Sequence, residues 1–198
     1  VASVQRTTPA PPITESAVGR PAVAMRRRLD GGYTLARTSA ATHHLLPASL
    51  RWSRAYLPIL KARWRMMRFR LGRPFLEALT DARLDGDRPG PFERTRVLDP
   101  APDHRLLDDV LACAARAWPQ LAGVRPAARW GGMIDVLPDE LPAIGPVPGT
   151  EGLVAATGFS GHGFGIGPAA GRAVADLVAG AGADDLAAFR VPRFAAAP

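Results

Sequence analysis

A run of closely spaced glycines near the end of the chain constrains the fold more than any other feature. Four glycines alternate with other residues: Gly161, Gly163, Gly165 and Gly167. They separate the apolar run of residues 151–159 from a stretch rich in alanine and valine. The pattern predicts a strand, a glycine loop and then a helix from Pro168 to the glycine stop at Gly180. Glycine backbone can approach a flat or anionic group without intervening side chains.

The start of that helix also favours a negatively charged ligand. Its first N–H groups have no partner within the helix, and the helix dipole adds about half a positive charge there. The pyrimidine edge of a reduced flavin, around N1 and C2=O, is negative and suits such a loop. The G-x-G-x-G-x-G spacing and the short remaining chain exclude a dinucleotide phosphate loop. A tight turn in which glycine serves packing alone stays open, and the glycines by themselves favour it.

The rest of the chain predicts an α+β fold, a mostly antiparallel sheet with helices on one face. Strands are expected at the N-terminus, over 129–137, and in a hairpin over 22–36 that turns at Asp30-Gly31-Gly32. One helix is expected over 47–71, kinked or divided at Pro58 and ended by Gly72-Arg73-Pro74. A second is expected over 103–118. Its apolar stripe consists of Leu106, Leu107, Val110, Leu111 and Ala114.

Composition excludes several classes of protein. The chain has 198 residues, 47% of them hydrophobic, which is enough for a buried core. A single cysteine, Cys113, excludes a disulfide scaffold. No apolar run is long enough to span a membrane and the N-terminus has no secretion-signal layout, so a cytoplasmic location is expected. No metal site is expected, because His43 and His44 have no third ligand nearby.

Residues 51–73 hold eight basic residues, no acidic one and four aromatic side chains. This composition is typical of a helix on a membrane surface or of a nucleic-acid contact. It also fits a helix with a basic, solvated face. The segments on both sides carry the family resemblance described next, and this favours the helix with a basic, solvated face. We therefore expect no nucleic-acid partner and keep a basic binding module as an alternative.

Two segments carry a family resemblance. TGFSGHGFGIGPAAGRAVADLVAG, and WGGMIDVLPDELPAIGPVPGTEGLVAATG before it, resemble the C-terminal part of the FAD-dependent amine and amino-acid oxidoreductases. This superfamily includes glycine oxidase, sarcosine oxidase and D-amino-acid oxidase. TTPAP, RRRLDGGYTLA and FERTRVLDPAPD are similar to its substrate domain, in the same order. The resemblance implies that residues 1–128 are part of a substrate domain and that residues 129–198 contact the flavin.

The resemblance also implies a missing part. The family begins with a Rossmann domain whose G-x-G-x-x-G binds the FAD pyrophosphate, and no such element occurs in this chain. FAD is therefore expected to bind only together with a Rossmann domain, supplied in cis or by a separate chain. Because the chain also lacks an initiator methionine, we expect a fragment of a longer polypeptide. A non-catalytic subunit or an orphan fragment is the alternative.

The resemblance assigns residues to the flavin site. The implied flavin contacts are Gly132, Met133, Ile134, Gly161, His162, Gly163, Phe164, Gly165 and Ile166. Gly165 stands where sarcosine-oxidase-like members have a lysine, so backbone amides and the helix dipole are expected to act there. Gly132 stands where some relatives attach flavin through a cysteine, which excludes covalent attachment at this position.

The implied substrate pocket holds Tyr33, His44 and Ile134. Ile134 stands where several amino-acid oxidases have the arginine that pairs with the substrate carboxylate. A secondary or less polar amine is therefore as plausible a substrate as an α-amino acid, unless Arg37 substitutes. The complete enzyme is expected to transfer hydride from the carbon α to the amine onto flavin N5, and the imine then hydrolyses. No residue stands out as a catalytic base.

Overall fold

The computed structural model describes residues 1–38, 41–80, 89–181 and 184–194. The chain divides into two compact units. Unit 1 consists of residues 1–46 and 65–133, and unit 2 consists of residues 47–64 and 134–198. The main sheet is antiparallel and is combined with helices, so the predicted α+β class is confirmed. The functional division between residues 128 and 129 stays a prediction.

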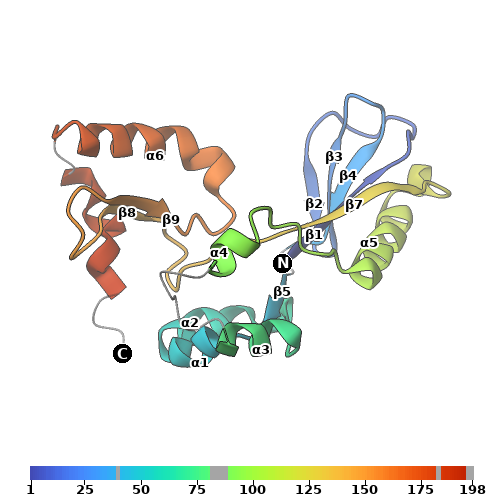
Figure 1. The fold of residues 1–198 in the computed structure, drawn as a ribbon. Helices are drawn as coiled ribbons and strands as arrows, with labels where there is room; N and C mark the ends of the chain where they lie inside the picture. Colours follow the sequence, from blue (N-terminus) through green and yellow to red (C-terminus); the bar gives the residue numbers. More distant parts are fainter. Residues whose placement is uncertain (39–40, 81–88, 182–183, 195–198) are drawn as a thin grey trace. The chain divides into compact units, whose positions relative to one another are not determined.

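A five-stranded antiparallel sheet forms the centre of unit 1 (Figure 1), with the strand order β2-β3-β4-β1-β7. The strands are β1 (Ala2–Thr7), β2 (Val18–Arg20), β3 (Val23–Arg27), β4 (Tyr33–Ala36) and β7 (Pro126–Gly132). The predicted N-terminal strand and hairpin are confirmed. Gly31, in the turn between β3 and β4, has a φ of 80°, which glycine adopts without strain. The strand predicted over 129–137 instead begins at Pro126 and ends at Gly132.

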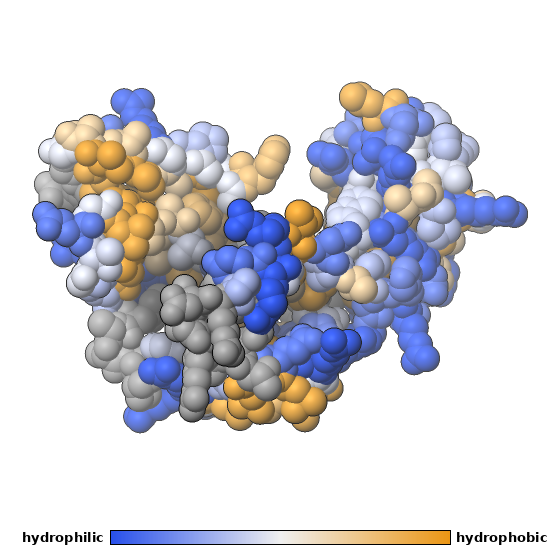
Figure 2. All heavy atoms as spheres, viewed as in Figure 1, coloured by the Kyte–Doolittle hydropathy of each residue, from blue (hydrophilic) through white to orange (hydrophobic). Residues whose placement is uncertain are grey.

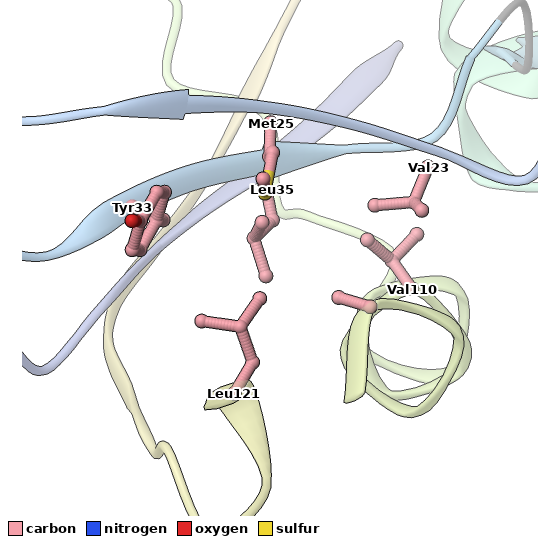
Figure 3. Packing of buried hydrophobic residues seen from close by; sticks show 7 residues of the cluster. Val23, Met25, Tyr33, Leu35, Val110 and Leu121 are labelled. Carbon is pink, nitrogen blue, oxygen red and sulfur yellow. The ribbon is translucent and has the colours of Figure 1, made fainter. Parts of the chain in front are cut away.

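Helix α5 (His104–Ala117) covers one face of this sheet and confirms the second predicted helix. Four residues of its apolar stripe are buried, whereas Leu111 is half-buried. A one-turn helix, η2 (Pro119–Leu121), follows it. The core between sheet and helix contains Val23, Met25, Tyr33, Leu35, Val110, Ala114 and Leu121 (Figure 3). Inward residues alternate along β1, β3 and β4, as a half-buried sheet requires.

The central strand β1 contributes polar side chains to this core. Ser3, Gln5 and Thr7 are all buried. Gln5 Nε2 donates to the carbonyl of Leu107 on α5 at 2.8 Å, and Ser3 Oγ accepts from the N–H of Asp103 at 2.9 Å. Because an unpaired buried polar group costs about 1–3 kcal/mol, these bonds specify how α5 lies on the sheet.

Asp103 is the N-cap of α5, and we expect its removal to destabilise unit 1. Its Oδ1 accepts from the N–H of Leu106 at 3.1 Å, and its Oδ2 lies 3.2 Å from Arg70. Asp103→Ala is expected to lower the unfolding free energy by about 1–2 kcal/mol in urea titrations. Asp103→Asn keeps a capping oxygen and loses only the charge, so about 0.5 kcal/mol is expected. Equal losses in the two variants would contradict a capping role.

The helix predicted over 47–71 is wrong in its second half. The structure has α1 (Pro47–Arg51) and α2 (Ser53–Arg63), and the break between them lies at Trp52 rather than Pro58. After a one-turn helix, η1 (Trp64–Met66), the chain forms strand β6 (Met67–Arg70), which pairs in parallel with β5 (Ala41–His44). In Met67–Arg70 apolar and basic residues alternate, which is the strand period, and pairing with β5 outweighs the helical spacing.

Gly72-Arg73-Pro74 begins a helix rather than ending one. Helix α3 (Arg73–Thr80) has Pro74 in its first turn, where the missing proline N–H costs nothing. A short helix, α4 (Pro91–Arg94), follows further along. Residues 81–88, between α3 and α4, lie outside the described residues, and residues 95–100 between α4 and α5 form neither helix nor strand.

Unit 2 contains a two-stranded antiparallel sheet of β8 (Ala143–Pro146) and β9 (Val154–Thr157), and α6 (Gly163–Val178) packs against both strands (Figure 1). Two short 3-10 helices, η3 (Asp184–Phe189) and η4 (Val191–Phe194), follow α6. Strand β8 was not predicted. The predicted stop at Gly180 is confirmed, since its φ is 74°. Helix α6 begins five residues before the predicted Pro168, which therefore lies inside the helix.

Candidate functional site at the start of the last helix

Asp135 holds the turn that leads from β9 into α6. Its Oδ2 accepts from Thr157 Oγ1 at 2.6 Å and from the N–H of Gly158 at 2.9 Å. Its backbone carbonyl accepts from the N–H of Ser160 at 2.9 Å. One residue therefore binds the turn at three successive points. Asp135 was not among the predicted site residues.

The backbone of this turn is left-handed at three residues. Gly158, Ser160 and Gly161 have φ values of 72°, 51° and 86°. A Cβ at position 158 would overlap the side chain of Leu137, so glycine is required there for space as well as for conformation. A Cβ at position 161 would lie 3.8 Å from Ile134 Cδ1. The turn thus brings together two of the predicted site residues, Ile134 and Gly161.

The N-terminus of α6 has no side-chain cap. His162 is the N-cap residue, and its carbonyl accepts from the N–H groups of Gly165 and Ile166 at 3.0 and 3.2 Å. Among the described residues, the N–H groups of Gly163 and Phe164 meet no acceptor. Both point out of the first turn, where the helix dipole is positive. The free N–H groups predicted at the helix start are therefore present, but they lie in the first turn of α6 and not behind a longer glycine loop.

The surface around the N-terminus of α6 is apolar and exposed. Phe164 is fully exposed, and Ile134 and Ile166 are each about 40% exposed. No heavy atom lies within 4 Å of a Cβ built at Gly165. Exposed backbone amides beside apolar side chains can hold a flat ring with an electronegative edge, so the residues present fit the pyrimidine edge of a flavin. In unit 1, Met133 is exposed and Gly132 is half-buried at the end of β7.

Two of the predicted pocket residues lie in unit 1. Tyr33 is completely buried, and its Oη accepts from the N–H of Ile13 at 2.8 Å and donates to the carbonyl of Pro11 at 3.2 Å. This position gives no support for contact with substrate. His44 is half-buried in β5. Its neighbour His43 meets Phe69 edge-on at 5.9 Å between ring centroids, and burial lowers the pKa of His43 below its ordinary value.

Comparison with known proteins decides the family. A family model described as "FAD dependent oxidoreductase" (DAO) matches residues 8–177. The chain belongs to the DAO family. The glycine oxidase of Pseudomonas aeruginosa is 39% identical to this DAO chain over 82 residues, which cover 41% of this chain and 22% of that protein. FAD-dependent oxidoreductase domain-containing protein 1 of Bos taurus is 41% identical over 71 residues, covering 32% of this chain and 15% of that protein.

Two solved structures have a similar fold. The L-amino acid deaminase of Proteus myxofaciens, in complex with anthranilate, has a TM-score of 0.89 and 26% identity, covering 98% of this chain and 43% of that one. The glycine oxidase of Geobacillus kaustophilus has a TM-score of 0.61 and 18% identity, covering 97% of this chain and 38% of that one. The matched segments thus span less than half of each relative.

Two features are absent from the residues that the structure describes. None of the helices in the described ranges has both the length and the hydropathy needed to cross a bilayer. The same ranges contain no group of three potential metal-ligating side chains.

Proposed function

We propose that this chain is the C-terminal portion of a flavin-dependent oxidoreductase that oxidises a C–N bond of a small amine or amino acid. The observation that carries the proposal is the uncapped, exposed start of α6 beside Ile134. Membership of the DAO family supports FAD as the cofactor. The predicted flavin contacts in the glycine turn and in residues 132–134 belong to this proposal.

The chain's own groups would orient the cofactor and stabilise charge. The N–H groups of Gly163 and Phe164 would donate to the electronegative edge of a bound ring, and the dipole of α6 would favour negative charge at that edge. When bound, FAD would supply the hydride acceptor for oxidation at the carbon next to the amine nitrogen. Covered by a bound ring, the side chains of Ile134 and Ile166 would exclude water from it, and a dry surrounding favours the neutral amine that this oxidation requires.

Unit 2 lacks a complete core of its own, which supports a missing partner. Nine of the buried hydrophobic residues in the described ranges lie in unit 1, and two, Ala143 and Ile144, lie in unit 2. No residue of the apolar helix α6 is buried. Figure 2 shows hydrophobic atoms gathered over α6. An exposed apolar surface of this kind marks an interface, and we assign it to a dinucleotide-binding half, supplied in cis or by a separate chain.

Ile134 affects the choice of substrate. Isoleucine cannot form the bidentate pair that arginine forms with a carboxylate. A secondary or less polar amine is therefore at least as plausible a substrate as an ordinary α-amino acid. Arg37, half-buried just after β4, is the alternative carboxylate partner.

The test is flavin retention. The chain is purified with added FAD, alone and co-expressed with a dinucleotide-binding half that carries G-x-G-x-x-G. We expect visible flavin bands only for the complex, and anaerobic bleaching of those bands by a substrate amine. A matched control replaces a glycine of the fingerprint and should lose the bands. A complex that binds no flavin would contradict the proposal, and flavin that no amine reduces would favour a non-catalytic subunit.

A further inference from the structure

Helices α1 and α2 carry a surface of unit 2 that the proposed flavin chemistry does not use. Residues 47–64 contain Arg51, Arg54, Lys61 and Arg63 and no acidic residue. No residue of α1 or α2 is buried. Both helices therefore present most of their side chains to the surroundings, and cations dominate the charge.

One side of α2 is fixed to unit 2. Tyr56 Oη donates to the carbonyl of Val136 at 2.8 Å, and Arg63 forms an ion pair with Glu140 at 2.8 Å. The half-buried Ile59 and Leu60 lie one turn from Tyr56. Because this side is held by unit 2, the orientation of the opposite side is also fixed.

The exposed side of α2, together with Trp64 directly after it, alternates basic and apolar residues. Arg54, Leu57, Lys61 and Trp64 follow one another at spacings of three and four, which places them on one helix face. Leu57 is 44% exposed and Trp64 is 59% exposed. We call these four residues the Arg54–Trp64 stripe. Leu50 in α1 adds a side chain that is 64% exposed.

We propose that the Arg54–Trp64 stripe binds the surface of an anionic lipid bilayer. Exposed leucine and tryptophan side chains are stabilised when they are buried at the boundary between a bilayer and water, and tryptophan is enriched at that depth. Arginine and lysine attract anionic headgroups while their aliphatic stems lie along the apolar residues. A nucleic-acid backbone would satisfy Arg54 and Lys61 but would leave Leu57 exposed. The mixed pattern therefore favours lipid, with α2 lying along the surface rather than crossing it.

This inference does not depend on flavin binding, so the two proposals fail separately. A membrane-bound chain that retains no flavin would overturn only the proposed function. A flavin-binding complex without affinity for lipid would overturn only the present inference.

The first experiment compares vesicles of different charge. Flotation is measured with vesicles of phosphatidylcholine alone and of phosphatidylcholine with phosphatidylglycerol. We expect binding to the anionic vesicles that weakens as salt rises. Arg54→Gln/Lys61→Gln removes two of the stripe's charges, and a contribution of about 1 kcal/mol per charge predicts about 30-fold weaker binding. The matched control Arg172→Gln/Arg190→Gln removes two exposed charges from unit 2 outside the stripe and should change binding less than about threefold.

The second experiment locates the contact. Brominated lipid in the anionic vesicles is expected to quench Trp64, and Trp64→Phe should remove most of that quenching. Leu57→Ser should weaken binding several-fold, whereas Leu29→Ser, at a fully exposed leucine of unit 1, should not. Circular dichroism confirms that each variant is folded.

Four outcomes would overturn the inference. They are equal binding to neutral and anionic vesicles, no binding to either, equal losses in the stripe and control variants, and release of the vesicles when the dinucleotide-binding half is added. Retention on DNA that Arg54→Gln/Lys61→Gln abolishes, with no vesicle binding, would assign the stripe to nucleic acid instead.

Discussion

Gly131→Ala is expected to lower the unfolding free energy of the chain by about 2–3 kcal/mol. A Cβ at this position would overlap the carbonyl oxygen of Pro100, where the segment before α5 crosses β7. The obstacle is backbone, so it cannot rotate away as a side chain would. Either the Pro100 segment or the edge strand β7 must shift. Urea unfolding followed by tryptophan fluorescence measures the loss.

The neighbouring glycine provides a matched control. Gly132 lies in the same strand, and no heavy atom lies within 4 Å of a Cβ built there. Gly132→Ala is expected to change the unfolding free energy by less than about 0.5 kcal/mol. Equal effects of the two substitutions would show that the cost comes from glycine in a strand and not from the approach of Pro100.

Much of unit 1 could be predicted because its signals are local. The hairpin has a glycine turn between two alternating runs, and α5 has an apolar stripe between two prolines. Both patterns are formed by residues that lie only a few positions apart in the sequence. Strand β6 could not be recognised in this way, because its partner β5 lies more than twenty residues away. Parallel pairing of that kind leaves no turn between the strands for a sequence to display.

The candidate site was predictable in part for the same reason. The glycine turn and the uncapped helix start are local features, and both are present. The exact start of α6 was predicted too late, because Pro168 suits a first turn and glycines lower the helix propensity before it. Helix α6 nevertheless begins at Gly163, with its half-buried residues packed on β8 and β9. Packing against the sheet outweighs propensity here.

Asp135 gave no signal in the sequence. It lies 22 residues before Thr157, and nothing in its own neighbourhood indicates that its carboxylate will meet a distant turn. Tyr33 shows the same limit, because an aromatic residue on a predicted hairpin fits a pocket and a core equally well. Its hydrogen bonds to Ile13 and Pro11 are formed inside unit 1. In both cases a contact far along the chain decides the role.

Asp135→Ala is expected to loosen the turn before α6 and to weaken flavin binding in the complete protein. The substitution removes acceptors from Thr157 Oγ1 and from the N–H of Gly158. Two bonds to a carboxylate at an exposed position are worth about 2 kcal/mol together. If the N–H groups of Gly163 and Phe164 hold the ring edge, a loss of that size corresponds to about 30-fold weaker FAD binding. Hydrogen exchange of the Gly158 N–H measures the opening of the turn in the chain alone. Titration with FAD measures the affinity of the complex for the cofactor.

Matched substitutions separate positioning from a general loss of stability. Asp135→Asn keeps one acceptor oxygen, so it should recover most of the exchange protection at Gly158 and most of the FAD affinity. Thr157→Val removes a single hydrogen bond and should fall between the two, at about 1 kcal/mol. Faster exchange at Gly158 with unchanged FAD affinity would mean that the turn is a packing element, and the flavin edge would then have to meet the chain elsewhere.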